Sequence, residues 1–152
     1  MIEIYGDLWL HRPADARVIT TNGYVRNDGA AVMGRGCAKQ AKDLFPGVEY
    51  SLGQALDRYG NHVSKIWTIH GKTPLYSFPV KHHWSQQASE QLIEQSANEL
   101  VAIIDLHSQS VQQLNAIVLP RPGCGNGNLA WEIVKLIIEP ILDNRFHVIT
   151  HG

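Results

Sequence analysis

The sequence predicts an α/β protein in which helices cover both faces of a mixed, largely parallel β-sheet. Short runs of strand-forming residues alternate along the chain with segments whose apolar residues recur at helical spacing. One run, Ala116-Ile117-Val118-Leu119, is apolar at every position, which is typical of a strand buried on both faces. The chain has 152 residues, of which 44% are hydrophobic and 18% charged, so it can bury a core. We expect a single domain over residues 1–152 with three layers, α/β/α.

The first third of the chain predicts two strands and a helix. Strands are expected at Ile2–Ile4 and at Arg17–Thr20, where β-branched and apolar residues gather. A helix is expected from Cys37 to Phe45, because its apolar residues fall on one helical face. Pro46-Gly47 would end that helix.

The middle of the chain predicts two more strands between two helices. Residues 48–59 fit one helical face, and the turn Gly60-Asn61 follows them. Strands are expected near Val63–Ile69 and Leu75–Phe78. From Ser85 to His107 the pattern indicates a long helix with one apolar stripe, formed by Leu92, Ile93, Ala97, Leu100, Val101 and Ile104.

The last third completes the alternation. The buried strand ends at Pro120, a helix is expected from Ile133 to Ile141, and a final strand from Phe146 to Thr150. Ligands in such folds bind beyond the carboxyl ends of the parallel strands, where loops lead into helices. The loops after the strands are therefore the places to look for a site.

Charge and cysteine content limit the protein class. The formal net charge is −1, yet residues 12–82 carry ten Lys or Arg against five Asp or Glu, whereas residues 83–152 carry three against seven. An ordinary solvated surface is the preferred interpretation of this basic half, and a site for an anionic ligand is the alternative. Cys37 and Cys124 are too few for a disulfide framework. Because no signal peptide or membrane span is recognisable, we expect a cytoplasmic protein without a membrane partner.

Two glycine-rich loops are the candidate binding sites. The first runs from Asn22 to Gly36, and the second from Pro122 to Asn128, which is a candidate N-cap of the following helix. Glycines let backbone N–H groups approach an anion, and a helix N-terminus adds a partial positive charge. We therefore expect the loops to hold a diphosphate from both sides. The alternative is that the glycines only form tight turns.

Several other kinds of site are disfavoured. Neither loop has the spacing of a nucleotide-hydrolysing P-loop or of a dinucleotide fingerprint. Cys124 lies at a helix start, but no base accompanies it, so a small residue in a tight turn is the preferred interpretation. The histidines lack metal-ligand spacing, and we expect surface side chains at His62, His70, His82 and His83.

Four segments resemble the macrodomain family, whose members bind ADP-ribose. They are Gly6-Asp7-Leu8, Thr21-Asn22, Gly34-Arg35-Gly36-Cys37-Ala38 and Pro120 to Leu129, and their order and spacing match over almost the whole chain. The resemblance implies that Asp7 accepts a hydrogen bond from the adenine amino group and that Asn22 orients the distal ribose. It also implies that the two glycine-rich loops bind the diphosphate without any metal or cofactor. The ligand-binding residues expected in this way are Asp7, Leu8, Asn22, Val32, Met33, Gly34, Arg35, Gly36, Cys37, Pro120, Gly123, Cys124, Gly125, Asn126 and Gly127.

A further segment resembles one branch of that family. Phe78-Pro79-Val80-Lys81-His82-His83-Trp84 is similar to the lysine-dependent branch, which includes terminal ADP-ribose glycohydrolase and the macrodomain of the antitoxin DarG. The resemblance implies that Lys81 is catalytic, because a lysine beside the distal ribose can attack or polarise the anomeric carbon. An exposed lysine that only pairs with the ligand phosphate is the alternative.

Two departures from the family bear on the substrate. Members that use an activated water carry an aspartate where this chain has Met33, so that mechanism is not expected. Members that act on modified acidic side chains have an aspartate in the second loop, where Gly127 stands, whereas the branch acting on thymidine in DNA lacks it. The stretch from Asn22 to Gly29 is longer than in the DNA branch, and His82 replaces an arginine.

The function expected from the resemblance is hydrolysis that removes single ADP-ribose units from a modified macromolecule, with thymidine-linked ADP-ribose on DNA as the favoured substrate. Lys81 and Asn22 would be the catalytic residues. Trp84 beside Lys81 could stack on a base of single-stranded or otherwise exposed DNA, with core packing as the alternative. An ADP-ribosyltransferase toxin is the expected partner protein. The alternatives are a reader that binds ADP-ribose without chemistry and a phosphatase for ADP-ribose 1″-phosphate.

Overall fold

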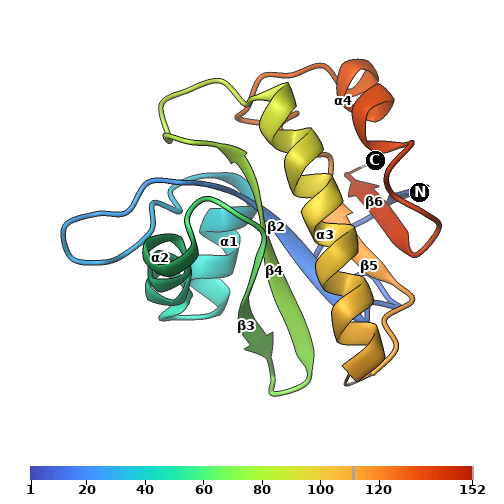
Figure 1. Cartoon of the computed structure of the whole chain (residues 1–152), viewed down its shortest axis with the longest axis horizontal. Coiled ribbons are helices and arrows are strands. Elements are labelled where there is room, and N and C mark those ends of the chain that lie inside the picture. Colours follow the sequence, from blue (N-terminus) through green and yellow to red (C-terminus); the bar gives the residue numbers. More distant parts are fainter. Residues whose placement is uncertain (111, 152) are drawn as a thin grey trace.

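Six strands form one sheet in the order β1-β6-β5-β2-β4-β3, in a computed structural model that describes residues 1–110 and 112–151 (Figure 1). The strands are β1 (Ile2–Tyr5), β2 (Ala16–Asn22), β3 (Ser64–Ile69), β4 (Thr73–Lys81), β5 (Ile117–Pro120) and β6 (Phe146–Thr150). Every neighbouring pair is parallel except β3 and β4, which are joined by a short turn and run antiparallel. The expectation of a mixed, largely parallel sheet is confirmed.

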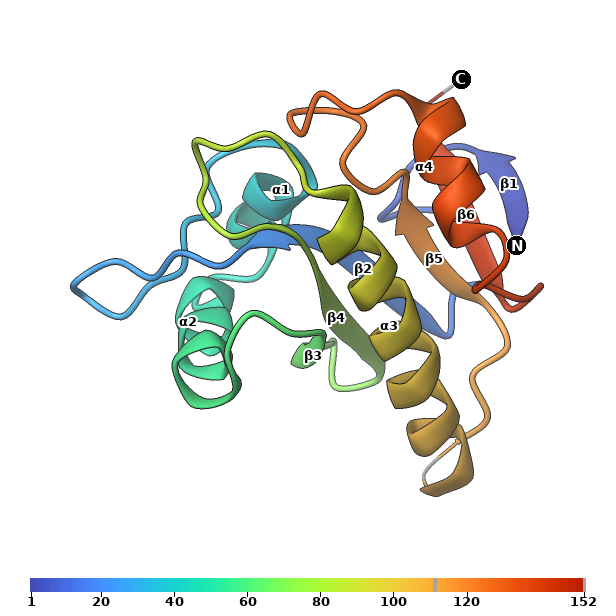
Figure 2. The same cartoon turned by 45° about the horizontal axis from the view of Figure 1, so that its top comes forward.

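Helices cover both faces of the sheet (Figures 1 and 2). Helices α1 (Gly36–Leu44) and α2 (Val48–Tyr59) lie on one face, and α3 (Glu90–Ser110) and α4 (Trp131–Ile138) lie on the other. Each pair of helices closes a separate hydrophobic cluster against the sheet. Within the described part of the chain, no helix combines the length and the apolar character that crossing a membrane would need.

Strand β5 shows why the continuous apolar run becomes a central strand. Ile117, Val118 and Leu119 are fully buried, yet they face opposite sides of the sheet. Ile117 and Leu119 pack in the cluster under α3 and α4, whereas Val118 packs in the cluster under α1 and α2. Burial of such side chains stabilises the fold by about 1.5–3 kcal/mol each, so polar residues at these positions would be costly.

Several expected boundaries were wrong: β4 runs to Lys81 rather than Phe78, and α3 runs to Ser110 rather than His107. Helix α3 begins at Glu90 rather than Ser85, because Ser89 accepts a hydrogen bond from the Leu92 N–H at 3.2 Å and residues 85–89 form a loop. Asn128 is not the N-cap of α4: it has a φ of 62° in the turn before the helix, and Ala130 takes the N-cap position. Helix α4 ends at Ile138, so Ile141 lies in the turn that follows.

Candidate active site

A cavity of about 740 Å³ opens where four parallel strands end. The last residues of β2, β4, β5 and β6, namely Asn22, Lys81, Pro120 and Thr150, all line it. Carboxyl ends of parallel strands meet at one edge of a sheet, and this edge is the usual ligand site in α/β folds. The volume lies in the range of small-molecule and cofactor sites, about 300–1,000 Å³.

Most of the expected ligand-binding residues line this cavity together. They are Leu8, Asn22, Val32, Met33, Gly34, Arg35, Gly36, Cys37, Lys81, Pro120, Gly123, Gly125, Asn126 and Gly127. Asp7 and Cys124 are not among the lining residues. The cavity wall also includes residues that sequence reasoning did not single out: Thr20, Gln40, Ile149, Thr150 and His151. Thr20, Ile149 and Thr150 could have been found by taking the carboxyl ends of the expected strands as part of the site.

Asp7 shapes a turn at the edge of the cavity. Its carboxylate Oδ1 accepts a hydrogen bond from the Trp9 N–H at 2.7 Å, and its carbonyl accepts from the N–H groups of Leu10 and His11. The neighbouring residues Gly6 and Leu8 line the cavity. Asp7 itself does not line the cavity, so its contact with adenine stays a prediction.

The first glycine-rich loop ends at the start of α1. Arg35 has extended backbone angles and provides no side-chain cap, so the first N–H groups of α1 have no side-chain acceptor there. Gly36 and Cys37, which carry two of these groups, line the cavity. A Cβ atom on Gly34 would meet nothing within 4 Å, which means that the fold itself does not require glycine at this position. The open space and the uncapped helix N-terminus suit an anion.

Helix α2 packs directly against this loop. A Cβ atom on Gly53 would lie 1.9 Å from the Gly29 carbonyl oxygen, so the loop rests directly on the helix backbone. The Ala31 N–H also donates to the Glu49 carbonyl at 2.9 Å. Sequence reasoning missed Gly53, although a glycine inside a helical pattern is a recognised sign of close backbone approach.

The second glycine-rich loop is tightly packed at one position and open at another. A Cβ atom on Gly127 would lie 2.5 Å from the Gly123 carbonyl oxygen and 2.7 Å from Ala88 Cβ. At Gly125 it would meet nothing within 4 Å, and Gly125 lines the cavity. The loop in this conformation therefore cannot accept an aspartate in place of Gly127, and it keeps free space at Gly125.

Both cysteines are poor nucleophiles. Burial raises the pKa of Cys124 to about 11, and its thiol packs toward the cluster under α3 and α4. Burial also raises the pKa of Cys37, whose Sγ lies 3.4 Å from Thr20 Oγ1. A thiol that stays protonated does not attack, which agrees with the interpretation of Cys124 as a small residue in a tight turn.

Lys81 and Asn22 are neighbours on adjacent strands. Lys81 of β4 is paired with Asn22 of β2 in the sheet register. The register shifts just before this pair, so Val80 has no paired residue on β2. Lys81 Nζ donates to the Asn126 carbonyl at 3.2 Å and to the Trp84 carbonyl at 3.5 Å. The Asn22 amide donates to the Val32 carbonyl at 2.9 Å and accepts from the Tyr24 N–H at 3.0 Å. Lys81 thus links the end of β4 to the second loop, whereas Asn22 connects the two ends of the first loop.

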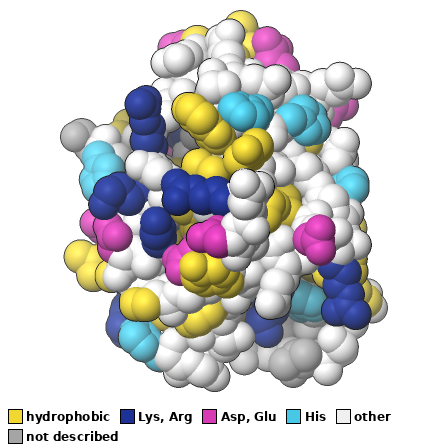
Figure 3. Space-filling model, turned by 90° about the vertical axis from the view of Figure 1, so that its left-hand side faces the viewer, with side chains coloured by type: hydrophobic (Ala, Val, Ile, Leu, Met, Phe, Trp, Pro, Cys, Tyr) yellow, Lys and Arg dark blue, Asp and Glu magenta, His cyan; other side chains and the backbone are white. Residues whose placement is uncertain are grey.

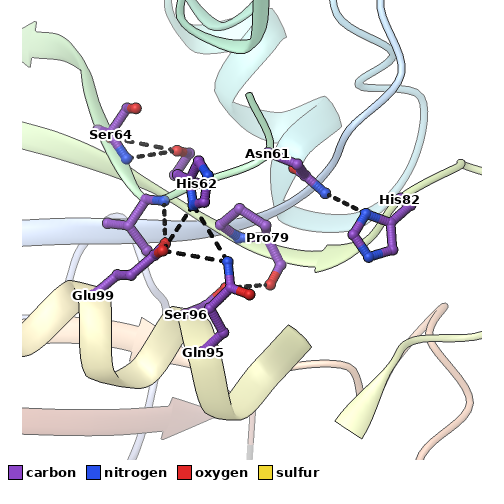
Figure 4. Close-up of polar contacts among 10 residues, drawn as sticks. Asn61, His62, Ser64, Pro79, His82, Gln95, Ser96 and Glu99 are labelled. Atoms are coloured by element: carbon purple, nitrogen blue, oxygen red, sulfur yellow. Dashed lines mark hydrogen bonds and ion pairs between the residues drawn. The ribbon is translucent and has the colours of Figure 1, made fainter. Parts of the chain in front are cut away.

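A polar network behind Lys81 holds the end of β4 (Figure 4). Asn61 Nδ2 donates to the Lys81 carbonyl at 2.9 Å and lies 3.3 Å from His82 Nδ1. On the α3 side, the buried Ser96 hydroxyl donates to the Pro79 carbonyl at 2.6 Å. The two contacts flank the irregularity in β4 on either side, so they fix the backbone from which Lys81 projects. The sequence showed only a turn at Asn61.

The histidines make local polar contacts. His62 Nδ1 lies 2.7 Å from Glu99 Oε2, and His83 Nδ1 lies 2.7 Å from Ser85 Oγ. Over residues 1–110 and 112–151, no three His, Cys, Asp or Glu side chains are grouped in a way that could hold a metal ion. Met33, which stands where water-activating members carry an aspartate, is 2% exposed and packs in the core.

The chain was compared with known proteins by sequence and by structure. No model of a protein family matches the chain. The curated DNA ADP-ribosyl glycohydrolase of Thermus aquaticus is 30% identical over 140 residues, which cover 88% of this chain and 36% of that protein. The chain thus spans about a third of the length of the curated relatives it matches.

Solved structures agree with the sequence comparison. The macrodomain of Thermus aquaticus DarG has a TM-score of 0.77 and 27% identity, and the match covers 99% of this chain and 97% of that one. A structure of Thermosipho africanus DarTG in complex with ADP-ribose has a TM-score of 0.71 and 21% identity, covering 97% of this chain and 41% of that one.

Proposed function

Because this chain is a macrodomain, similar over its length to the macrodomain of DarG, we propose that it binds ADP-ribose and removes it from ADP-ribosylated DNA. The likeness to DNA ADP-ribosyl glycohydrolases suggests the reaction. The main structural support for the proposal is that Asn22 and Lys81 are paired on adjacent strands. This pair and the two glycine-rich loops line the same cavity. A distal ribose beside this pair would leave the diphosphate between the loops.

The diphosphate would be held by backbone donors rather than by a metal. The start of α1 offers the N–H groups of Gly36 and Cys37, and the second loop offers those around Gly125. Arg35 and Arg121, which also line the cavity, add positive charge. The Asp7 carboxylate would accept a hydrogen bond from the adenine amino group.

Lys81 would carry the chemistry at the anomeric carbon of the distal ribose. Its free amine would attack that carbon and break the bond to the base, which leaves with a proton; water then hydrolyses the Lys81 adduct and releases ADP-ribose and the free amine. Alternatively, its ammonium would hydrogen-bond to the departing base while a water molecule attacks the anomeric carbon and gives its proton to the base. Asn22 would orient the ribose through its amide, which has a second N–H besides the one given to Val32. Borohydride reduction during turnover distinguishes the two roles, because only attack by the amine forms a reducible covalent adduct.

The absence of an acid in the second loop supports DNA as the substrate. Members acting on modified acidic side chains have an aspartate where Gly127 is packed too closely to accept a side chain. We also propose that a cognate ADP-ribosyltransferase toxin supplies the modified DNA. We expect the protein to act in the cytoplasm, where the free thiols of Cys37 and Cys124 would stay reduced.

The test compares the wild type with Lys81→Ala on a single-stranded oligonucleotide that carries one ADP-ribosylated thymidine. Wild type should release ADP-ribose, and Lys81→Ala should bind free ADP-ribose without releasing it from the DNA. Lys39→Ala is the matched control, because Lys39 pairs with Asp43 on the exposed side of α1. Full activity of Lys81→Ala would overturn the catalytic role. Tight binding without any product in wild type would identify a reader, and phosphate release from ADP-ribose 1″-phosphate alone would identify a phosphatase.

A further inference from the structure

Three aromatic rings from two separate loops lie together at the mouth of the cavity. Tyr24 follows β2, and its ring meets the His83 ring edge-on with the centroids 4.9 Å apart. His83 in turn lies against Trp84, with the centroids 5.0 Å apart and the planes tilted by 31°. We call these three residues the aromatic rim.

Two of the three rings of the aromatic rim, those of Tyr24 and Trp84, are exposed, and His83 is half-buried. Trp84 is 53% exposed and Tyr24 is 41% exposed. Neither side chain belongs to, or packs against, either hydrophobic cluster. Core packing therefore does not explain Trp84. Large exposed aromatic side chains that are close together are typical of an interaction surface.

Hydrogen bonds within the two loops order the aromatic rim in the protein without a bound ligand. The His83 N–H donates to Gln86 Oε1 at 3.0 Å, and the Tyr24 N–H donates to Asn22 Oδ1 at 3.0 Å. The His83 ring is fixed by its contact with Ser85. The backbone that presents the rings is thus ordered before a planar group stacks on them, which lowers the entropy lost on binding.

The rim lies next to the proposed reaction centre. Trp84 lines the cavity, and its carbonyl is 3.5 Å from Lys81 Nζ. Tyr24 comes two residues after Asn22. Whatever is attached to the anomeric carbon beside Lys81 and Asn22 would leave the cavity past these rings.

The surrounding charge favours a polyanion. The three loops around the cavity, residues 22–36, 81–89 and 120–130, contain four Lys or Arg and one Asp. Figure 3 shows hydrophobic and histidine side chains side by side on this flank of the molecule, with a group of Lys and Arg near them. Alternating aromatic and basic side chains are the usual means of binding single-stranded nucleic acid, because every base has a face that can stack.

We infer that the aromatic rim stacks the bases that flank the modified base in a single DNA strand, with Trp84 as the main platform. This inference rests on the proposed function and assigns the recognition of the flanking bases to these three residues, since bases in a single strand expose the faces on which rings stack. Stacking of this kind changes affinity about five- to hundredfold per base on removal of the ring.

The experiment compares two substrates: ADP-ribosylated thymidine as a free nucleoside, and the same nucleoside at the centre of a five-nucleotide single strand. Wild type should have a kcat/KM about tenfold or more higher for the strand. Trp84→Ala should lose most of this preference, Trp84→Tyr should keep it, and Tyr24→Ala should lose part of it. Tyr59→Ala, which removes an exposed aromatic ring of α2, should keep the full preference.

Each other outcome has a defined meaning. Equal kcat/KM for the two substrates in wild type, or an equal loss on both in Trp84→Ala, overturns the inference while leaving the proposed function intact. A Trp84-dependent gain on an ADP-ribosylated peptide overturns it in favour of a protein substrate. Failure to bind ADP-ribose or to cleave either substrate contradicts the proposed function itself. If ADP-ribose binds but is not released, the same comparison is made with the dissociation constants of the two substrates.

Discussion

The side-chain amide of Asn61 holds the backbone of Lys81: Asn61 Nδ2 donates to the Lys81 carbonyl oxygen at 2.9 Å. The other amide atom, Asn61 Oδ1, is buried and has no hydrogen-bond partner among the described residues. A Cβ atom on Gly23 would lie 2.8 Å from the Asn61 amide, so the side chain is wedged between the ends of β2 and β4. Asn61 thus joins the two strand ends that carry Asn22 and Lys81.

Asn61→Ala should lower kcat with little change in ADP-ribose affinity. Removal of the amide frees the Lys81 backbone, and a displacement of about 1 Å at a reacting group costs about a hundredfold in rate. We expect kcat on the modified oligonucleotide to fall about tenfold or more, as steady-state kinetics and calorimetry of ADP-ribose binding would show. Asn98→Ala, which removes an amide bonded only to Glu94 within α3, is the control. A rise in KM at constant kcat would contradict the positioning role.

Gly127→Ala and Gly125→Ala should differ although they lie in one loop. The added Cβ at Gly127 would be 2.5 Å from a backbone oxygen, whereas at Gly125 it meets open space. Overpacking of this kind costs about 1–3 kcal/mol, and a neutral surface change stays within about 0.5 kcal/mol. Thermal unfolding should therefore show a lower Tm for Gly127→Ala alone.

Gly125→Leu tests whether this loop contacts the ligand. The longer side chain should enter the cavity and abolish ADP-ribose binding while the Tm stays near that of wild type. If Gly125→Leu binds normally, the diphosphate does not lie against this loop.

Gly53→Ala should destabilise the protein even though alanine favours helices. In an exposed helix the change would stabilise by about 1 kcal/mol. Here the new Cβ would be 1.9 Å from the Gly29 carbonyl oxygen, and that clash dominates. We expect a lower Tm and weaker ADP-ribose binding, because the displaced loop leads to Met33 and Gly34. Gln54→Ala, at an exposed position of the same helix, should leave both unchanged.

His107 should make stability depend on pH. Burial, together with the nearby Lys65 charge, holds the pKa of His107 below its ordinary value of 6.5. The unfolded chain therefore binds a proton more readily, and the free energy of unfolding should decrease as the pH falls below about 6.5. The His107 ring also contacts the Tyr76 hydroxyl, whose pKa burial raises to about 12. Urea unfolding at pH 7 and pH 5 should show a smaller pH effect in His107→Asn than in wild type. An unchanged pH effect would mean that other groups control it.

Local pattern was sufficient for the layers and for the two glycine-rich loops of the cavity wall, whereas the individual ligand-binding residues were expected from the family resemblance. The apolar stripe of α3 and the continuous run of β5 predicted which faces are buried, because burial depends on periodicity that is visible over a few residues. The glycine-rich loops were recognisable for the same reason: each lies directly between a strand and a helix in the chain. The misplaced start of α3 and the wrong cap at Asn128 arose where side-chain hydrogen bonds and a left-handed φ decided the boundary.

The amino-acid sequence by itself determined the α/β alternation and the two loops, since these depend on residues that are near one another in the chain, whereas the candidate Lys81 came from the resemblance of its segment to one branch of the family. Tertiary structure alone decided that Asn22 and Lys81 are neighbours, that Asn61 and Ser96 hold the end of β4, and that Gly53 supports the first loop. These contacts join segments far apart in the sequence, and their geometry depends on sheet register and close packing. The grouping of Tyr24 with His83 and Trp84 has the same origin, because β2 and β4 are adjacent in the sheet and their following loops meet at the cavity mouth.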